Sequence, residues 1–456
     1  MNDAIDLQSL DAKLEAGNVR YVKVAVTDVD GILRGKYIHI DKFKSALKKG
    51  FGFCSVVLGW DSGDVCYDHV DYTGWHNGYP DSLVHLDPGS FREVPWDRGV
   101  PFFLGNFVSD DGQSSLPLCP RGLLKKIVGD AKALGFESVS GCEFEWFNFK
   151  ETPDSLAQKD FVRPEPLTPG MFGYSLLRAS ENQDFMHEMM DALEAFRVPL
   201  EGLHTETGPG VYEAAIQCDH SLEAADRAVL FKSSVKEIAR QYGITASFMA
   251  RWNASLPGCS GHIHQSLCDE NGKNLFFSES SKYGMSEVFE SYLAGLIHCL
   301  PDFLPMMAPT VNSFKRLVKG FWAPTSATWG VDNRTCALRV IPSGASSTRV
   351  EVRVPGADMN PYLAVSAALG AGLYGIKHKL SLKDQPVIGN GYECTSAPAF
   401  PEDLEKAAKR FKESEPACEV FGEAFVKHFA TTRLWEWEQA QKAVTDWEMK
   451  RYFEII

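Results

Sequence analysis

The chain has 456 residues, of which 44% are apolar and 23% are charged, proportions that are typical of a globular enzyme. Its length predicts two or three domains with a sizeable core. The formal net charge of −14 argues against a nucleic-acid-binding protein and a polybasic membrane anchor, so we expect neither nucleic acid nor membrane as a partner.

The segment 1–17 is acidic and lacks the apolar core of a signal peptide. The 11 cysteines are scattered without a CxxC pair, which is typical of reduced thiols, so we expect a cytoplasmic protein. The longest apolar stretch runs over 15 residues, from Tyr362 to Ile376, and is rich in Gly and Ala. It is short for a membrane span and predicts a buried helix.

Alternating apolar and polar residues over 20–40, around a turn at Asp30-Gly31, predict a β-hairpin. Further short strands are expected over 51–108. The polar segment 109–120 contains Gly and Pro and predicts a boundary between a domain at 1–115 and a domain at 116–456.

Apolar residues at helical spacing over 120–135 predict a helix that stops at Gly135. Asn360-Pro361 is typical of a helix start, with Asn as the cap and Pro in the first turn. From Phe400 onward the chain is expected to be mostly helical. The predicted fold class is α+β, with a small β-rich domain followed by a large α+β domain.

Four short segments carry residues that are suited to metal and phosphate chemistry. In the first, Glu143 and Glu145 share one face of a predicted strand whose other residues are apolar. Two carboxylates there are costly unless they are paired or bind a cation, although a strand edge with solvated Glu residues is an open alternative.

The second segment is a predicted hairpin around the turn 207–210. A four-residue loop there places His204 opposite Glu213 and Glu206 opposite Val211, so that His204, Glu206 and Glu213 share a face. The alternative is an exposed hairpin face. In the third segment, His262 and His264 also share a strand face, which favours a ligand or phosphate site over two structural histidines.

The fourth segment places Arg349, Glu351 and Arg353 on one face of a strand whose other face is valine. Upstream of it the sequence adds four further basic residues: Lys315, Arg316, Arg334 and Arg339. Arginines together with carboxylates suit phosphoryl transfer, and the alternative is a surface salt-bridge network. The sequence has no P-loop, dinucleotide fingerprint or nucleophile elbow, so metal ions and arginines must hold any nucleotide.

Five separated motifs together resemble the glutamine synthetase family: TDVDG, CEFEWF, ETGPGVYE, SGHIHQSL, and NSFKRL through RVEVR to NPYL. The resemblance implies an N-terminal β-grasp-like domain and a C-terminal catalytic α/β barrel. It also implies a homo-oligomer of two stacked hexamers with active sites between subunits. The region of Trp60 then faces the catalytic domain of the next subunit.

The same resemblance implies roles for individual residues. Two ions of Mg²⁺ or Mn²⁺ are expected, one held by Glu145, Glu206 and Glu213 and the other by Glu143, His262 and Glu351. ATP is expected at His264, Ser266, Arg339 and Arg349, with His204 near the nucleotide. L-Glutamate and the transferring phosphoryl group are expected at Arg316, Arg334 and Arg353.

Two departures from the family pattern concern the amine. The Asp-Gly-Ser-Ser motif, whose Asp helps to bind ammonium, is absent, and only Asp61 lies in that region, next to Trp60. Trp322 stands where the family carries a Glu that takes a proton from ammonium. An indole cannot accept that proton, but it can stack on an organic amine. Alternatively, Trp322 packs in the loop and another carboxylate serves.

The sequence therefore predicts a ligase that uses ATP to join the γ-carboxylate of glutamate to an organic amine, similar to the γ-glutamylpolyamine synthetase branch. The choice between a polyamine and a ring-bearing monoamine stays open. The alternatives are a true glutamine synthetase that uses ammonia and a structural relative without catalysis. The presence of all six expected metal ligands argues against the structural relative.

Overall fold

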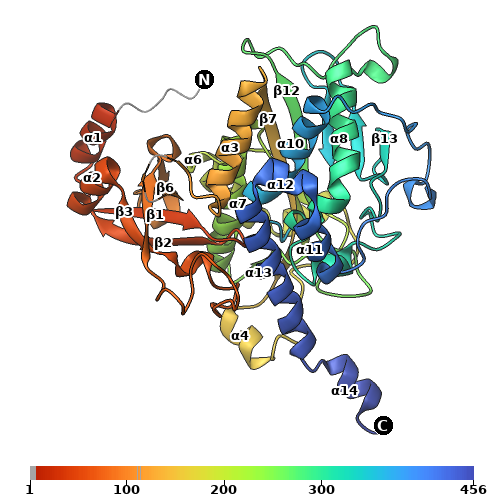
Figure 1. Ribbon diagram of the computed structural model, residues 1–456. Helices are drawn as coiled ribbons and strands as arrows, with labels where there is room; N and C mark the ends of the chain where they lie inside the picture. The colour runs from red at the N-terminus through yellow and green to blue at the C-terminus, as the bar shows by residue number, and fades with distance from the viewer. Residues whose placement is uncertain (1–6, 110, 113) are drawn as a thin grey trace.

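The computed structural model describes residues 7–109, 111, 112 and 114–456, and their strands form two separate sheets. Figure 1 shows the N-terminal part, with β1 to β6, beside a larger part that contains β7 to β15. The segment between Phe107 and Pro120 joins the two parts. The expected boundary at 115/116 falls inside that segment and stays a prediction. The described helices include none that is both long and apolar enough to cross a membrane.

The N-terminal sheet has the strand order β2-β1-β6-β4-β3, with β5 paired to β6. The predicted hairpin is confirmed, because β1 and β2 pair antiparallel with Thr27 opposite Leu33, and Gly31 in their turn has a φ of +83°. The strands are β1 (Tyr21–Thr27), β2 (Leu33–His39), β3 (Phe51–Cys54), β4 (Asp81–Leu86), β5 (Arg92–Val94) and β6 (Val100–Phe107). The helices of this part are α1 (Leu7–Ala16) and α2 (Ile40–Lys49).

The large sheet has the order β13-β14-β15-β12-β7-β9-β8, and β10 and β11 also pair with β7. Within the described residues its end strands, β8 and β13, do not pair with each other, so closure into a barrel stays a prediction. The strands are β7 (Glu137–Phe149), β8 (Leu200–Thr205), β9 (Val211–Ile216), β10 (Asp219–His220), β11 (Thr245–Ser247), β12 (Gly261–Cys268), β13 (Trp329–Val331), β14 (Leu338–Ile341) and β15 (Arg349–Val352).

Helices cover one face of the large sheet. α3 (Pro120–Ala133) and α7 (Ser221–Gln241) contact β7, while α10 (Pro361–Lys377) contacts β12 and packs on α8 (Glu287–Phe303). The predicted helix at 120–135, the Asn360 cap and the buried helix over 362–376 are all confirmed. The remaining helices are α4 (Pro153–Gln158), α5 (Leu176–Glu181), α6 (Gln183–Ala195), α9 (Ser313–Arg316), α11 (Leu404–Glu413), α12 (Glu415–Phe421), α13 (Glu423–Lys442) and α14 (Asp446–Tyr452).

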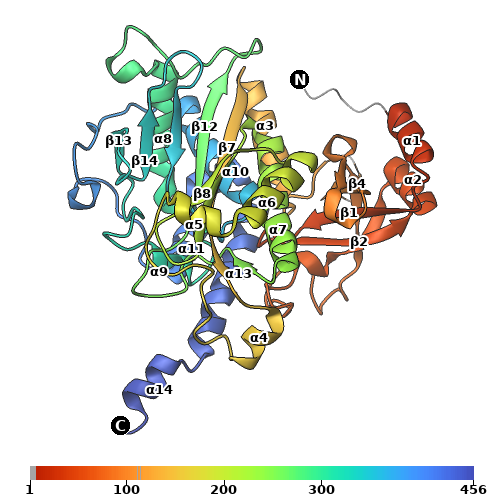
Figure 2. The ribbon, with the colours of Figure 1, turned by 180° about the vertical axis from the view of Figure 1, so that it is seen from behind.

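Figures 1 and 2 both show α14 extending away from the rest of the chain beyond α13, so the C-terminal region is helical, as expected. Buried ion pairs join the N-terminal part to the larger part. Arg121 on α3 donates to Asp226 on α7 at 2.8 and 2.7 Å and to Asp87 at 2.8 Å. Tyr362 on α10 donates to Asp226 as well, at 2.6 Å. These bonds fix the two sheets relative to each other.

A lysine under the sheet predicts how stability depends on pH. Lys232 on α7 donates to the Met359 carbonyl at 2.7 Å, and its ammonium lies 5.7 Å from the Phe144 ring. Burial and the charge of Lys236 lower the pKa of Lys232 to about 7. Between pH 7 and about 10 the unfolded chain therefore binds more protons than the folded chain, and stability rises with pH by up to about 1.4 kcal/mol per unit.

We expect the variant Lys232→Met to lose this contribution to the pH dependence. The measurement is the difference in free energy of unfolding between pH 7 and pH 9, compared for the wild type and the variant. An equal difference for both proteins means that Lys232 keeps an ordinary pKa in the fold.

Candidate active site

The strand β7 places its carboxylates on the face of the sheet that the helices leave free. Phe144 and Trp146 point to the helical side, where both rings pack near Phe231 of α7. Because side chains alternate along a strand, Glu143 and Glu145 point to the opposite side. The predicted strand and its faces are thus confirmed, and the apolar face anchors the acidic face.

Three neighbouring strands add a histidine and further carboxylates to that face. His262 of β12 pairs with Glu143, and its Nδ1 lies 3.2 Å from Glu143 Oε1 and 3.4 Å from Glu351 Oε1. The predicted hairpin register is confirmed, since His204 of β8 lies opposite Glu213 of β9, with Nε2 and Oε2 3.3 Å apart. The structure therefore brings β7, β8, β9, β12 and β15 together at one acidic cluster.

Three sets of ligand atoms in this cluster lie close enough to hold a metal ion. They are Glu143, Glu213 and His262; His204, Glu206 and Glu213; and Glu143, His264 and Glu351. Five of the six predicted metal ligands thus occur in these sets. The sixth, Glu145, is in none of them among the described residues, and its Oε2 accepts a hydrogen bond from the Ser260 amide at 2.8 Å.

The carboxylates of the cluster are electrostatically unequal. Burial, a hydrogen bond with Glu143 and the charges of nearby carboxylates raise the pKa of Glu213 to about 12. For Glu143 burial opposes ionisation, but hydrogen bonds from His262 and His264 prevail and hold its pKa well below the usual range. Burial likewise opposes ionisation of Glu351, yet His262 and the nearby arginines lower its pKa to about 2. A cation at this place relieves the repulsion that keeps Glu213 protonated.

His262 supplies a specific test of whether the residues fit a metal. Its Nδ1 faces the Glu143 carboxylate and carries the proton of that contact, so its Nε2 bears a lone pair. That Nε2 is buried and has no hydrogen-bond partner among the described residues. A histidine oriented by a carboxylate, with a free second nitrogen, suits a metal ligand. The donor set of carboxylates and one imidazole fits Mg²⁺ or Mn²⁺.

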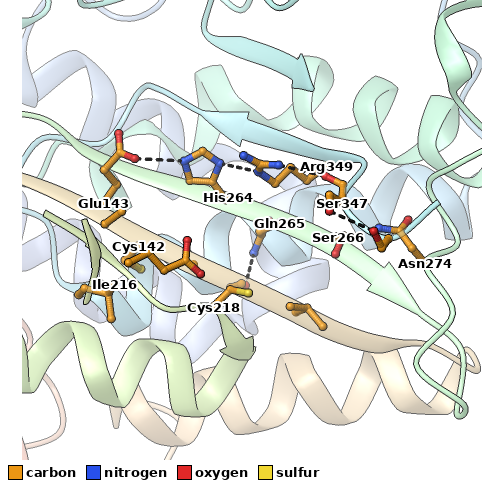
Figure 3. A pocket seen from close by; sticks show the side chains of 16 residues that line it. Cys142, Glu143, Ile216, Cys218, His264, Gln265, Ser266, Asn274, Ser347 and Arg349 are labelled. Atoms are coloured by element: carbon orange, nitrogen blue, oxygen red, sulfur yellow. Dashed lines mark hydrogen bonds and ion pairs between the residues drawn. The ribbon is translucent and has the colours of Figure 1, made fainter. Parts of the chain in front are cut away.

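A cavity of about 300 Å³ adjoins the cluster and is lined by Glu143, His264, Ser266 and Arg349 (Figure 3). Figure 3 shows Glu143, His264 and Arg349 in a row. Arg349 Nε donates to His264 Nδ1 at 3.2 Å, so neutral His264 carries its proton on Nε2, 3.7 Å from Glu143. Three of the four residues predicted to bind ATP therefore line one cavity beside the metal candidates.

The predicted arginines differ in their surroundings. Arg339 donates to Glu351 at 2.8 Å and to Asp332, and Arg353 forms a short ion pair with Glu351. Arg316 is buried and donates to the carbonyls of Val354 and Arg353 and to Ser260 Oγ.

Arg334 is exposed and makes no hydrogen bond or ion pair within the described residues. Arg339 and Arg353 thus flank Glu351, Arg316 supports the end of its strand, and Arg334 is free to reach a ligand.

The three predicted amine-site residues lie in different surroundings. Trp322 is 56% exposed and has a φ of +60°. Trp60 lies under the Arg34 guanidinium, 4.8 Å from the ring centroid. Asp61 accepts from two backbone amides of its own loop and from Trp435 Nε1 at 3.0 Å. Within one described chain, Trp60 and Asp61 therefore make structural contacts and do not approach the acidic cluster through any of them.

Sequence reasoning missed Tyr174, which lies in the loop before α5. Its ring stacks on His204 with centroids 4.4 Å apart, and its amide donates to the Thr205 carbonyl at 2.7 Å. Burial and the charges of Glu206 and Glu213 raise its pKa, while Arg334 opposes them. The only local signal was an aromatic residue in a glycine-rich loop, which does not reveal a partner 30 residues later.

The geometry defines an acidic metal-binding centre beside a cavity that is lined by basic side chains, an arrangement suited to phosphoryl transfer. The family model of the glutamine synthetase catalytic domain matches residues 117–452. The chain therefore belongs to the glutamine synthetase family, whose members are ATP-dependent ligases, as the motifs predicted.

Several relatives span nearly the whole chain. Type-1 glutamine synthetase 2 of Dictyostelium discoideum is 52% identical over 96% of this chain and 84% of its own. The glutamate–isopropylamine ligase of a Pseudomonas species is 37% identical over 97% of each chain. The γ-glutamylethanolamide synthetase of Streptomyces coelicolor is 34% identical over 99% of this chain and 96% of its own. A solved structure of GmaS with ADP has a TM-score of 0.84, at 25% identity over both complete chains.

Proposed function

We propose that the protein joins the γ-carboxylate of L-glutamate to an organic amine at the expense of ATP. The observation that carries this proposal is Trp322, an exposed indole where the family pattern has a Glu that accepts the proton of ammonium. An indole offers an apolar face and no acceptor, which favours a substituted amine over ammonium. The two relatives named as ligases of isopropylamine and ethanolamine support the same choice.

The residues of the acidic face would hold two divalent ions. We assign one ion to Glu145, Glu206 and Glu213 and the other to Glu143, His262 and Glu351. Bound Mg²⁺ or Mn²⁺ supplies charge neutralisation between the carboxylate and the phosphates that have to meet. The unpartnered His262 Nε2 and the protonated state of Glu213 support this assignment, because both change favourably when a cation is present.

ATP occupies the cavity in this proposal, with His264, Ser266, Arg339 and Arg349 as contacts and His204 nearby. The solved complex of GmaS with ADP supports a nucleotide site in a protein of this fold. Arg349 fixes the His264 ring, so His264 presents a defined N–H toward the centre. The fork-shaped guanidinium groups suit phosphate oxygens better than a point charge does.

L-Glutamate is assigned to Arg316, Arg334 and Arg353. Its γ-carboxylate attacks the terminal phosphorus of ATP, ADP departs, and γ-glutamyl phosphate results. The amine then displaces phosphate and forms the amide. Arg334 is free to bind, whereas Arg316 and Arg353 hold the strand that ends at Val352, so the chain's own contribution is placement of the acid against the nucleotide.

The assembly proposed is a homo-oligomer of two stacked hexamers. The N-terminal sheet is then a β-grasp-like domain, and the large sheet belongs to a catalytic α/β barrel with its active site between subunits. Trp60 and Asp61 reach the amine only through such an interface, because their contacts within one chain lie elsewhere.

The test is phosphate release with ATP, L-glutamate and Mg²⁺ across a panel of amines. We expect a strong response to at least one organic amine, such as isopropylamine, ethanolamine or putrescine, and a weak response to ammonium. Chelation of the metal should abolish release, and added Mg²⁺ should restore it. Release that is independent of every amine contradicts the proposal.

A specific observation favours the alternative, a true glutamine synthetase that uses ammonia. The Dictyostelium relative with 52% identity carries that name. Ammonium as the best substrate in the panel would establish this alternative, and another carboxylate would then have to replace the missing base.

A further inference from the structure

Residues 384–400 form a strap that lies along residues 325–335, the segment that connects the loop of Trp322 to Arg334. In Figure 1 this blue segment passes beside β13. Backbone and side-chain hydrogen bonds fasten it at both ends: Trp329 Nε1 to Asp384 O, Val387 N to Trp329 O, Asn333 Nδ2 to Gly389 O, Gly391 N to Thr335 Oγ1, Ala327 N to Pro398 O and Phe400 N to Thr325 O. The strap is thus tied to both residues that flank Arg334.

Tyr392 occupies the middle of this strap, in a short turn that the Asn390 side chain caps. Its hydroxyl is buried and has no hydrogen-bond partner among the described residues. Buried hydroxyl groups are nearly always paired, because an unpaired one loses its hydrogen bonds with water. An unpaired hydroxyl at this position therefore requires an explanation.

The groups around this hydroxyl identify a partner for it. Burial raises the pKa of Tyr392, so the phenol stays neutral, while Arg353, Arg316 and the backbone amide of Trp322 act in the opposite direction. The hydroxyl consequently lies where the arginines assigned to glutamate meet the Trp322 loop. An amide N–H is a donor, and the phenol oxygen is an acceptor.

The Trp322 loop has reason to adopt a second arrangement. The φ of Trp322 is +60°, in the left-handed region that disfavours residues other than glycine, and more than half of its side chain is exposed. The adjacent loop residue Phe321 is held by the Arg251 guanidinium, 4.4 Å above its ring. Arg251 itself is fixed by four backbone carbonyls and by Asn312. One side of Trp322 is therefore anchored and the other is not.

We propose that Tyr392 is the latch of the Trp322 loop: when glutamate occupies the arginines, the Trp322 amide donates to Tyr392 Oη and the loop closes over the amine position. Tyr392 is a positioning residue in this scheme, since it acts on the amine through Trp322. The inference rests on the proposed function. It supplies the buried hydroxyl with the partner that burial demands.

The test is hydrogen exchange of the backbone amides over 318–325, in the full-length wild type and in Tyr392→Phe. The probes are L-glutamate and ADP with Mg²⁺, added together. In the wild type we expect at least tenfold slower exchange in this segment when the probes are present. In Tyr392→Phe we expect less than threefold slowing. Equal slowing in both proteins overturns the latch, as does its absence from the wild type.

Kinetics provide a second measure that a merely structural role would not move. We expect Tyr392→Phe to lower the ratio of kcat/KM for the preferred organic amine to that for ammonium by five- to tenfold, with an unchanged KM for ATP. The midpoint of urea unfolding should equal or exceed that of the wild type, because the variant removes an unpaired hydroxyl. An unchanged amine ratio contradicts the latch.

Tyr212→Phe is the matched control. Tyr212 on β9 also has a buried hydroxyl without a partner among the described residues, but its ring packs against Trp146 and Phe185 in the core. This variant should leave both loop exchange and amine ratio unchanged. Slowed exchange in a wild type that releases no phosphate with any amine would overturn the proposed function and still support the latch.

Discussion

The variant Glu351→Gln is expected to lose phosphate release by about 10³-fold or more relative to the wild type. Glu351 is buried, accepts a hydrogen bond from Arg339 at 2.8 Å and pairs with Arg353. The amide keeps the shape but removes the charge that the proposed metal and both arginines require. Leaving buried arginines without a counter-ion also destabilises the fold by about 3–5 kcal/mol.

Because of that cost, the measurement of release has to be accompanied by circular dichroism and by the mass of the assembly. Glu419→Gln is the matched control, since Glu419 pairs with Lys377 at 2.6 Å on the surface. Its release should stay within twofold of the wild type. If Glu351→Gln folds and retains a tenth of the wild-type release, the metal assignment is wrong.

The variant Trp322→Glu is expected to raise the ratio of kcat/KM for ammonium to that for the preferred organic amine by about 10- to 100-fold, or about 1.4–2.8 kcal/mol. A carboxylate at this position attracts ammonium and accepts its proton, and the apolar contact with a substituted amine is lost. Trp322 is more than half exposed, so the substitution leaves the core intact.

Trp322→Gln separates the two effects, because Gln has the length of Glu but carries no charge. It should lose the preference for the organic amine without gaining ammonium activity. Equal amine ratios in the wild type and Trp322→Glu would show that this loop does not select the amine.

Strand periodicity predicted the faces of β7, β9, β12 and β15 correctly, because the alternation of side chains is a local property. The apolar residues Phe144 and Trp146 determine which face of β7 is covered by helices, and Glu143 follows on the other. The pairing of His204 with Glu213 followed from the length of one turn. The family resemblance, which five ordered motifs carried, is confirmed by the match over 117–452.

The remaining features depend on contacts that no local pattern contains. Asp61 accepts a hydrogen bond from Trp435, a residue 374 positions later on α13. The stacking of Tyr174 on His204 and the burial of Arg316 likewise depend on how separate segments pack. Local chemistry identified the charged groups of the site, whereas only the assembled structure shows which of them already have partners.

The most direct test of the central claim is a competition in a single reaction. Wild-type protein is mixed with ATP, Mg²⁺, L-glutamate and equal concentrations of ammonium and isopropylamine, and the two amides are quantified by mass spectrometry. The account predicts that γ-glutamylisopropylamide exceeds glutamine by at least tenfold, and that ethanolamine or putrescine gives the same direction if isopropylamine is a poor substrate. Glutamine as the main product with every one of these amines would contradict it.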